Sequence, residues 1–360
     1  STHCISSAAS DVYKRQVAVV GPNADNRYNM LGDYTAPQED ENIKTVLDGV
    51  ISKLSPSKVE YVRGCAIRDT TVNEIAEVVE AASRSEVIIA VVGGSSARDF
   101  KTSYQETGAA IADEKSISDM ECGEGFDRAT LTLLGKQQDL LNALKATGKP
   151  LIVVYIEGRP LDKVWASEYA DALLTASYPG QEGGYAIADV LFGDYNPAGR
   201  LPVSVPRSVG QIPVYYNKKA PCNHDYVEQA ASPLYTFGYG LSYTTFEYSD
   251  LQVMRKSPCY FEVSFKVKNT GSYDGEEVAQ LYLRDEYASV VQPLRQLKCF
   301  ERFFLKRGEE KEIFFTLTEK DLSIIDRNMK RVVETGDFRI MIGASSDDIR
   351  LTKDISVESL

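Results

Sequence analysis

The 360-residue chain has the composition of an ordinary globular protein, with 43% hydrophobic and 26% charged residues. Its formal charge of −12 argues against nucleic acid as a partner, because nucleic-acid-binding proteins normally present a basic face. No apolar run reaches the roughly 18 residues of a membrane span, so we expect no transmembrane helix. The length favours two or more domains.

Residues 1–16 are polar and lack the apolar centre of a signal peptide. A strand-like apolar run then begins abruptly at Val17. We therefore expect residues 1–16 to be a non-native or disordered tail and the natural chain to be truncated at this point. No targeting signal can be read from such a sequence.

From Val17 to about residue 200, short apolar runs alternate with helical patterns. The apolar runs, which are typical of buried parallel strands, occupy residues 17–20, 87–92, 151–156 and 172–176. Apolar positions with helical spacing predict helices over residues 72–84, 136–146 and 183–193. This alternation predicts an α/β domain with a parallel sheet over residues 17–215.

The pattern changes after Pro206. Residues 216–245 contain two prolines, several tyrosines and few helical signals, which predicts a linker. From residue 246 onward, apolar and polar residues alternate, as in the run 260–268. About five to seven strands of this kind predict an antiparallel β-sandwich of the immunoglobulin or fibronectin type over residues 246–360.

Cysteine and histidine usage gives little support for metal or thiol chemistry. The six cysteines are scattered without a C-x-x-C pair, and the two histidines, His3 and His224, lie in the tail and in the linker. Zinc-ligand spacing is absent, and a Ser-His-Asp triad would need one of these histidines. We expect no metal and no cofactor.

The loop that follows the second apolar run, residues 93–135, is unusually long, and long loops are often functional. It carries two carboxylates three residues apart, Glu121 and Glu124, and the second lies between Gly123 and Gly125. A carboxylate on such a loop can donate a proton if its surroundings raise its pKa. The competing interpretation is a solvated surface loop, because acidic residues are usually exposed.

Other motifs allow both a functional and a structural interpretation. Gly93-Gly94 follows a strand but lacks the pattern of a phosphate-binding loop, so a nucleotide site is disfavoured. The run 179–184 opens a helix, either as an anion-binding nest or, as we favour, as a tight turn that needs small residues. We expect Trp165 to take part in core or interdomain packing, and Asp127-Arg128 to form a structural pair that shapes the loop.

Taken together, several stretches resemble the C-terminal part of glycoside hydrolase family 3, the β-glucosidase and β-xylosidase type. The resemblance covers essentially residues 17–360. The matching stretches are Val17–Asp25 with Leu31–Tyr34, Gly123–Arg128, Pro179–Gly184 continuing through Leu191–Pro202, and Tyr235–Tyr243.

The resemblance implies retaining, exo-acting hydrolysis of β-linked glycosides by two carboxylates about 5–5.5 Å apart. It implies that Glu124 is the general acid/base, with Glu121 as its rival, and that Asp33 and Arg98 lie near the sugar. It places the nucleophile, an Asp, on an N-terminal barrel domain that these residues do not contain, so we expect the isolated chain to be inactive. The resemblance also implies a periplasmic or secreted location, which is common among relatives.

A different class of function stays open at this stage. The sandwich and the aromatic loops would also suit a non-catalytic carbohydrate-binding or adhesion module. The sequence does not separate glucose from xylose as the substrate sugar, and it does not give the linkage.

Overall fold

A computed structural model describes residues 16–36, 38–96, 103–104, 106–107, 110–111, 119–123, 127–220 and 225–358. The chain divides into two compact units between Tyr195 and Asn196. Among the described residues, no helix is both long and apolar enough to cross a membrane.

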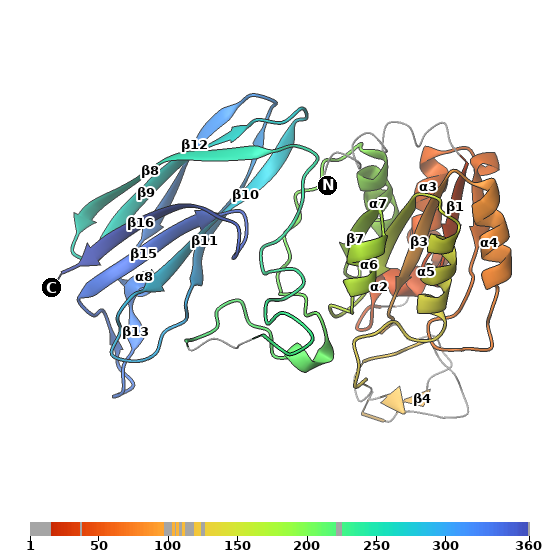
Figure 1. Cartoon of the computed structure of the whole chain (residues 1–360), viewed down its shortest axis with the longest axis horizontal. Coiled ribbons are helices and arrows are strands. Elements are labelled where there is room, and N and C mark those ends of the chain that lie inside the picture. Colours follow the sequence, from red (N-terminus) through yellow and green to blue (C-terminus); the bar gives the residue numbers. More distant parts are fainter. Residues whose placement is uncertain are drawn as a thin grey trace. The chain divides into compact units, whose positions relative to one another are not determined.

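A parallel five-stranded sheet with the order β2-β1-β3-β6-β7 forms the centre of the first unit (Figure 1). The strands are β1 (Val17–Val20), β2 (Val59–Val62), β3 (Val87–Gly93), β6 (Leu151–Ile156) and β7 (Ala172–Ala176). The strand order reverses between β1 and β3. The chain segments that follow these two strands therefore leave the carboxyl-end edge of the sheet in opposite directions. Such a switch point opens a crevice at the carboxyl ends of the strands, where α/β proteins place their sites.

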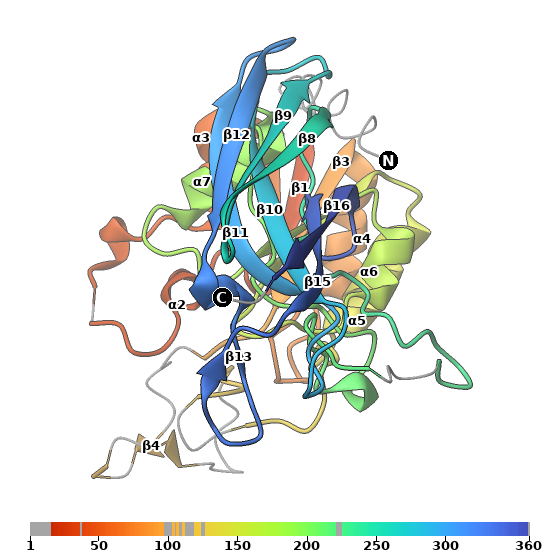
Figure 2. The ribbon, with the colours of Figure 1, turned by 90° about the vertical axis from the view of Figure 1, so that its left-hand side faces the viewer.

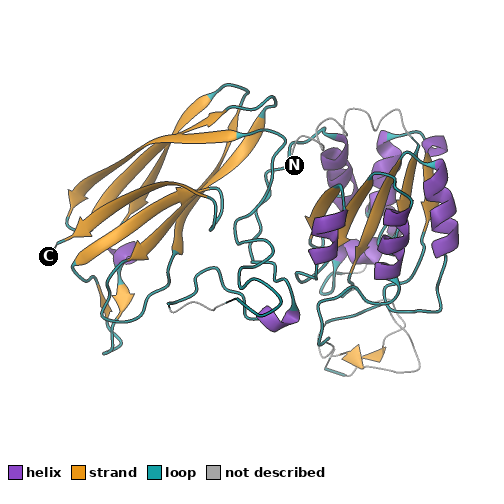
Figure 3. Ribbon diagram, in the orientation of Figure 1, coloured by secondary structure: helices purple, strands orange, loops and turns teal. Residues whose placement is uncertain are grey.

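Helices cover both faces of this sheet (Figure 3). On one face α3 and α7 bury Val50 and Ile187 against the strands, and on the other α4 and α5 bury Val78 and Leu140. The helices are α2 (Arg27–Leu31), α3 (Val46–Lys53), α4 (Ile75–Arg84), α5 (Gln137–Ala146), α6 (Val164–Tyr169) and α7 (Gly183–Phe192). Smaller elements are η1 (Asp40–Asn42), η2 (Pro56–Lys58) and the strand pair β4 (Ser103–Tyr104) and β5 (Ala110–Ile111). The predicted parallel α/β architecture is confirmed.

Gly184, in the run 179–184, allows close packing between α3 and α7. A Cβ atom on Gly184 would overlap the carbonyl oxygen of Thr45, and one on Gly49 would overlap the carbonyl oxygen of Gly184. Thr45 begins α3 with a capping box, in which it and Asp48 exchange side-chain and backbone hydrogen bonds. Close packing thus explains Gly184, and Gly180 adopts a positive φ of 84°, which favours glycine. Trp165 also packs as expected, against the core beneath α4 and α5.

The second unit is a β-sandwich of a four-stranded sheet, β11-β10-β15-β16, and a three-stranded sheet, β12-β9-β8 (Figure 2). Inward side chains of both sheets, including Phe265 and Leu281, form one core. The strands are β8 (Phe246–Ser257), β9 (Tyr260–Asn269), β10 (Gly275–Asp285), β11 (Gln296–Leu305), β12 (Glu310–Leu317), β15 (Gly336–Gly343) and β16 (Ile349–Val357). Short elements are η3 (Val209–Gln211), α8 (Glu319–Leu322), β13 (Ile324–Ile325) and β14 (Arg331–Val332). The predicted antiparallel sandwich is confirmed.

Residues 196–245, which precede the sandwich, belong to the same compact unit as the sandwich. Tyr216 stacks on Phe237 with 4.2 Å between ring centroids and meets Tyr282 of β10 edge-on. Arg200 forms a buried ion pair with Glu277 of β10 at 2.7 Å. The domain limits at residues 215 and 245 stay predictions, because a compact unit need not be an independently folding domain.

We predict that Gly49→Ala destabilises the first unit, although alanine is the better helix former by about 0.5–1 kcal/mol. The added methyl group would overlap the α7 backbone, and overpacking of this kind typically costs about 1–3 kcal/mol. Denaturant unfolding can be followed by Trp165, the chain's single tryptophan, which reports on this unit. Ser52→Ala on the exposed side of the same helix is the control, and equal stability of the two variants would contradict the prediction.

Candidate active site

The crevice between β1 and β3 is filled by the protein's own polar side chains. The Asn23 side-chain amide donates to the carbonyl of Gly94 at 3.2 Å, and that of Asn29 donates to Asn23 Oδ1 at 2.6 Å. The Ser95 hydroxyl in turn donates to Asn29 Oδ1 at 2.6 Å. All three side chains are buried, so this chain of hydrogen bonds ties the segment after β1 to the segment after β3.

The two glycines at the end of β3 are required by close contacts. A Cβ on Gly93 would overlap the carbonyl oxygen of Ile156, and one on Gly94 would overlap the carboxylate of Glu121. The Gln137 side chain accepts from the Gly93 N–H at 2.8 Å and donates to its carbonyl at 3.0 Å. The Gly93 backbone groups are therefore engaged within the protein, which gives no support to a phosphate site here.

Glu121 is the buried centre of the described part of the long loop. Its side chain is 1% exposed and forms an ion pair with Arg128, which is 6% exposed. Burial raises the pKa of the Glu121 carboxyl, while the neighbouring Arg128 guanidinium opposes that shift. Arg128 also donates to the Thr132 carbonyl and, at 3.3 Å, to Thr130 Oγ1. Its Nε has no hydrogen-bond partner among the described residues.

The start of this loop is held by the segment that follows β2. Asp119 accepts from Arg63 at 2.9 Å and from the Ile67 N–H at 3.1 Å. Arg68 donates to the Met120 carbonyl at 2.8 Å, and the Met120 side chain is buried. Two arginines and one carboxylate thus fix the backbone immediately before Glu121.

The end of the loop is held differently from the sequence-based prediction. Asp127 and Arg128 were expected to pair with each other, but their side chains pair elsewhere. Asp127 accepts from Arg159, beyond β6, at 2.6 Å, whereas Arg128 turns inward to Glu121. Arg128 contacts the Asp127 carboxylate through its backbone N–H, at 2.8 Å, and not through its guanidinium. The desolvated Glu121 is the stronger partner for a guanidinium because its charge is poorly screened.

Of the predicted site residues, Asp33 lies beside the loop. Its Oδ2 would be 3.3 Å from a Cβ built on Gly123, the residue that precedes Glu124 in the chain. Asp33 and Glu121 are therefore both next to the Cys122–Gly123 backbone. Glu124 and Arg98 lie outside the described residues.

The sequence did not single out Tyr178, although its ring contributes to this region. A Cβ on Gly32 would lie 2.5 Å from the Tyr178 ring, and one on Gly158 would lie 2.6 Å from its hydroxyl oxygen. Burial raises the pKa of Tyr178 to about 12, so it stays protonated at neutral pH. Gly32 ends α2 and Gly158 follows β6, and their spacing in the sequence gives no hint of a shared aromatic partner.

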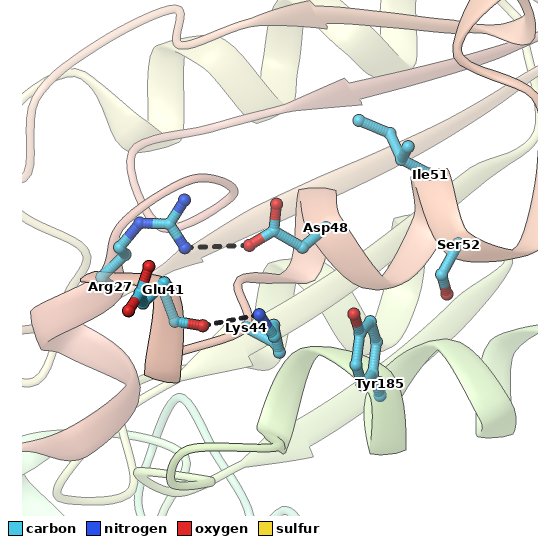
Figure 4. Close-up of a pocket in the computed structure, with 7 residues that line it drawn as sticks. All are labelled: Arg27, Glu41, Lys44, Asp48, Ile51, Ser52 and Tyr185. Carbon is cyan, nitrogen blue, oxygen red and sulfur yellow. Dashed lines mark hydrogen bonds and ion pairs between the residues drawn. The ribbon is translucent and has the colours of Figure 1, made fainter. Parts of the chain in front are cut away.

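A surface pocket of about 320 Å³ lies between α3 and α7 (Figure 4). Its lining residues are Arg27, Glu41, Lys44, Asp48, Ile51, Ser52 and Tyr185. Arg27 donates to the Ile43 carbonyl at 2.6 Å and to Asp48 at 2.9 Å, and Lys44 donates to the Glu41 carbonyl at 2.6 Å. These cations hold the segment before α3 in place, and we assign no ligand to the pocket.

Possible metal ligands do not gather in the described ranges, where no group of three or more His, Cys, Asp or Glu residues could hold an ion. The arrangement around the loop is instead that of charged and polar residues engaged with one another.

Comparison with known proteins identifies the family. The profile of the glycosyl hydrolase family 3 C-terminal domain matches residues 12–243, well over half of the chain. The chain belongs to glycosyl hydrolase family 3. A fibronectin type III-like domain matches residues 277–346, within the sandwich. The family and the fold class expected from the sequence are both confirmed.

Curated relatives of this family 3 chain are longer than the chain itself. A β-xylosidase of Formosa agariphila is 39% identical over 357 residues, which cover 94% of this chain and 46% of the relative. A periplasmic β-glucosidase of Salmonella typhimurium is 38% identical over 371 residues, which cover 93% and 45%. The chain thus spans about half the length of these relatives.

Solved structures agree with these matches. A β-glucosidase involved in saponin metabolism from intestinal bacteria superposes with a TM-score of 0.83 at 31% identity, covering 96% of this chain and 51% of that chain. A Listeria innocua β-glucosidase in complex with glucose superposes with a TM-score of 0.81 at 30% identity, covering 96% and 46%.

We predict that Arg128→Met destabilises the chain increasingly as the pH rises. Loss of the guanidinium would raise the folded-state pKa of Glu121 further above its unfolded value of about 4.3. The unfolded state would then bind fewer protons between these two pKa values, so stability falls with pH across that window. At neutral pH the loss should be about 3–5 kcal/mol, the range for breaking a buried pair.

The measurement is the free energy of unfolding from pH 5 to pH 8, relative to the unmodified chain. Arg84→Met, which removes an exposed pair with Glu60 and Glu80, is the control and should change stability little and with no such trend. Adding Glu121→Gln to Arg128→Met should remove the pH dependence of the stability loss. A slope that persists in this double variant would rule out Glu121 as its source.

Proposed function

We propose that this chain supplies the acid/base half of a retaining β-glycosidase, with Glu124 as the proton donor. The observation that carries the proposal is the burial and pairing of Glu121, the other carboxylate of the motif. Glu121 is sealed beneath Gly94 and paired with Arg128, so it is poorly placed to reach a glycosidic oxygen. Glu124 matches the acid/base position in the resemblance to family 3, and it is therefore the carboxylate of this motif that we propose as the donor.

In the proposed reaction, Glu124 protonates the leaving-group oxygen while a carboxylate nucleophile attacks the anomeric carbon. The bond from that carbon to the leaving group breaks, and a glycosyl-enzyme ester forms. Glu124, now ionised, takes a proton from water, and the water oxygen displaces the nucleophile to release the sugar. The nucleophile would come from a barrel domain outside these 360 residues, which is consistent with relatives about twice as long.

The proposed substrates are β-linked glucosides or xylosides cleaved from the non-reducing end. The Formosa relative is a β-xylosidase, and Listeria β-glucosidase structures contain glucose and laminaribiose. Asp33, beside Gly123, is suited to accept hydrogen bonds from sugar hydroxyl groups. We propose the same neighbourhood for Arg98 on the resemblance alone.

A non-catalytic glycan-binding module is the second candidate. It is favoured by Phe300 and Phe304, which are 67% and 51% exposed on β11, because exposed rings can stack on sugars. Glycan binding by calorimetry that survives Glu124→Ala and maps to residues 246–360 would support it over the acid/base role.

We predict that the isolated chain has negligible glycosidase activity, because one carboxylate of the pair is missing. The assay is release of nitrophenol from nitrophenyl β-glucoside and β-xyloside by the purified 360-residue chain. Its Glu124→Ala variant is the control for contaminating enzymes. Cleavage clearly above that control would show that the chain holds a complete site.

We further predict a leaving-group signature in a fused enzyme, in which this chain replaces the matching part of the Salmonella relative. Glu124→Gln should lower kcat on a β-linked disaccharide by about 10²–10⁴-fold, the usual contribution of a general acid. The same substitution should lower the rate of glycosidic bond cleavage in a dinitrophenyl glycoside far less, because that leaving group departs without a proton. Glu106→Gln, an exposed carboxylate of the same loop, is the matched control. Equal losses on both substrates would exclude Glu124 as the acid.

A further inference from the structure

We infer that Arg159 is a substrate-binding residue of the proposed site and that Tyr178 is a positioning residue, whose ring sets the spacing between Asp33 and Arg159. All three residues lie within the described ranges. The contact between Arg159 and a sugar rests on the proposed function. The positioning by Tyr178 does not, because it concerns the packing of this chain alone.

Tyr178 joins two chain segments that are far apart in the sequence. A Cβ on Gly32 would lie 2.5 Å from a carbon of its ring, and one on Gly158 would lie 2.6 Å from its hydroxyl oxygen. Each glycine is followed directly by a charged residue, Asp33 or Arg159. Because one rigid ring touches both glycines, it fixes the distance between the two segments that carry these charges.

The segment that carries Tyr178 is also hydrogen-bonded to both of its neighbours. The Gly180 N–H donates to the Met30 carbonyl at 2.8 Å, and the Glu157 N–H donates to the Ala176 carbonyl at 3.3 Å. The ring itself packs against the hydrophobic core formed by the sheet with α3 and α7. Tyr178 is therefore held by the core and by both segments, as a spacer between them must be.

The turn that carries Arg159 is closed by a buried ion pair. Glu157 accepts from Lys163 Nζ at 2.6 and 2.7 Å and from the Leu161 N–H at 3.1 Å. The Glu157 and Lys163 side chains are 4% and 1% exposed. A buried pair of this kind is a poor device for stability alone, but it ties the two ends of the turn together. Arg159 lies between these ends, so its backbone is restrained on both sides.

Asp33 and Arg159 approach the same two residues of the long loop. Asp33 Oδ2 would lie 3.3 Å from a Cβ on Gly123. Arg159 lies beside Cys122, where burial raises the pKa of the thiol and the Arg159 charge opposes that shift. Asp33 comes from the end of α2 and Arg159 from the turn after β6, so only the tertiary structure brings the two charges together.

The guanidinium of Arg159 has donors to offer to a ligand. Its side chain is 30% exposed, and that of Asp127, which accepts from it at 2.6 Å, is 73% exposed. An exposed ion pair of this kind contributes little to stability. The bond to Asp127 uses one of the five N–H donors of the guanidinium.

The combination of charges favours a neutral, polyhydroxylated ligand. A carboxylate such as Asp33 repels an anion, and a guanidinium such as Arg159 repels a cation. A sugar hydroxyl both donates and accepts hydrogen bonds, so adjacent hydroxyls can use the carboxylate and the guanidinium together. Such recognition depends on the spacing between acceptor and donor, which the Tyr178 ring sets.

The first experiment tests the positioning by Tyr178 in the 360-residue chain, by hydrogen exchange and mass spectrometry. The hydrogen-bonded amides of Gly32, Glu157 and Leu161 report on the two segments. Tyr178→Ala should raise their exchange rates about tenfold or more, because local opening no longer has to displace the ring. Tyr178→Phe keeps the ring and should stay close to the unmodified chain.

Tyr185→Ala, which removes a 37% exposed ring from α7, is the matched control and should leave these amides unchanged. Peptides of the buried strand β3 are the internal reference for global unfolding. If Tyr178→Ala folds poorly, Tyr178→Leu removes the ring and keeps an apolar side chain. Unchanged exchange in either segment of a folded Ala or Leu variant would overturn the positioning role.

The second experiment tests the sugar contact of Arg159 in the fused enzyme. Arg159→Gln should raise KM for a β-linked disaccharide about tenfold and change kcat less than about threefold, because the lost contact serves ground state and transition state alike. Arg159→Lys keeps the charge and should recover part of the loss. Asp127→Asn removes the exposed partner but keeps the guanidinium, so it should leave KM nearly unchanged.

An unchanged KM in Arg159→Gln would overturn the sugar contact. So would an equal rise of KM in Asp127→Asn, because Arg159 would then act only by holding Asp127. These results are independent of the leaving-group comparison for Glu124→Gln. If that comparison fails, the acid/base role is wrong, while the KM of Arg159→Gln and the exchange of Tyr178→Ala still decide the two parts of this inference.

Discussion

The reversal of strand order between β1 and β3 is the constraint on which the candidate site depends. Because their following segments diverge, the edge of the sheet is left with a crevice that must be filled or occupied by a ligand. Here Asn23, Asn29 and Ser95 fill it with mutual hydrogen bonds. Ser95 also accepts a hydrogen bond from the Glu121 N–H, so the filled crevice is joined directly to the described part of the long loop.

Most of the architecture could be predicted because it rests on continuous apolar runs. Strand β3, buried along its whole length, is an example. Strand β2 was missed because its four residues, Val-Glu-Tyr-Val, are only partly buried at the edge of the sheet. Helix α3 was missed although its capping box is visible in the sequence, because Gly49 interrupts a short pattern. That glycine is explained only by α7, which lies about 135 residues further on in the chain and cannot be inferred locally.

The candidate loop could also be located from the sequence, but its internal pairing could not. The adjacent Asp127 and Arg128 suggested a local pair, whereas burial decided otherwise. A guanidinium gains most from the carboxylate that water screens least, and Glu121 is that carboxylate. Which of two nearby acids is desolvated depends on Gly94 and on the end of β3, so it depends on tertiary structure. The family resemblance supplied a role for Glu124 and offered no role for Arg128.

In the proposed function, the two carboxylates of this short motif, Glu121 and Glu124, have different tasks. A group that exchanges protons with a substrate must reach both substrate and water. A group that orients the chain is better kept away from both. Glu121 meets the second condition, since its carboxylate is enclosed by Gly94 and Arg128. Arginine suits this partner because it remains charged when buried and contacts several acceptors at once, here also the Thr132 carbonyl and Thr130. A lysine would keep the charge and lose that set of directions, so the geometry of the loop depends on the shape of the cation as well as on its charge.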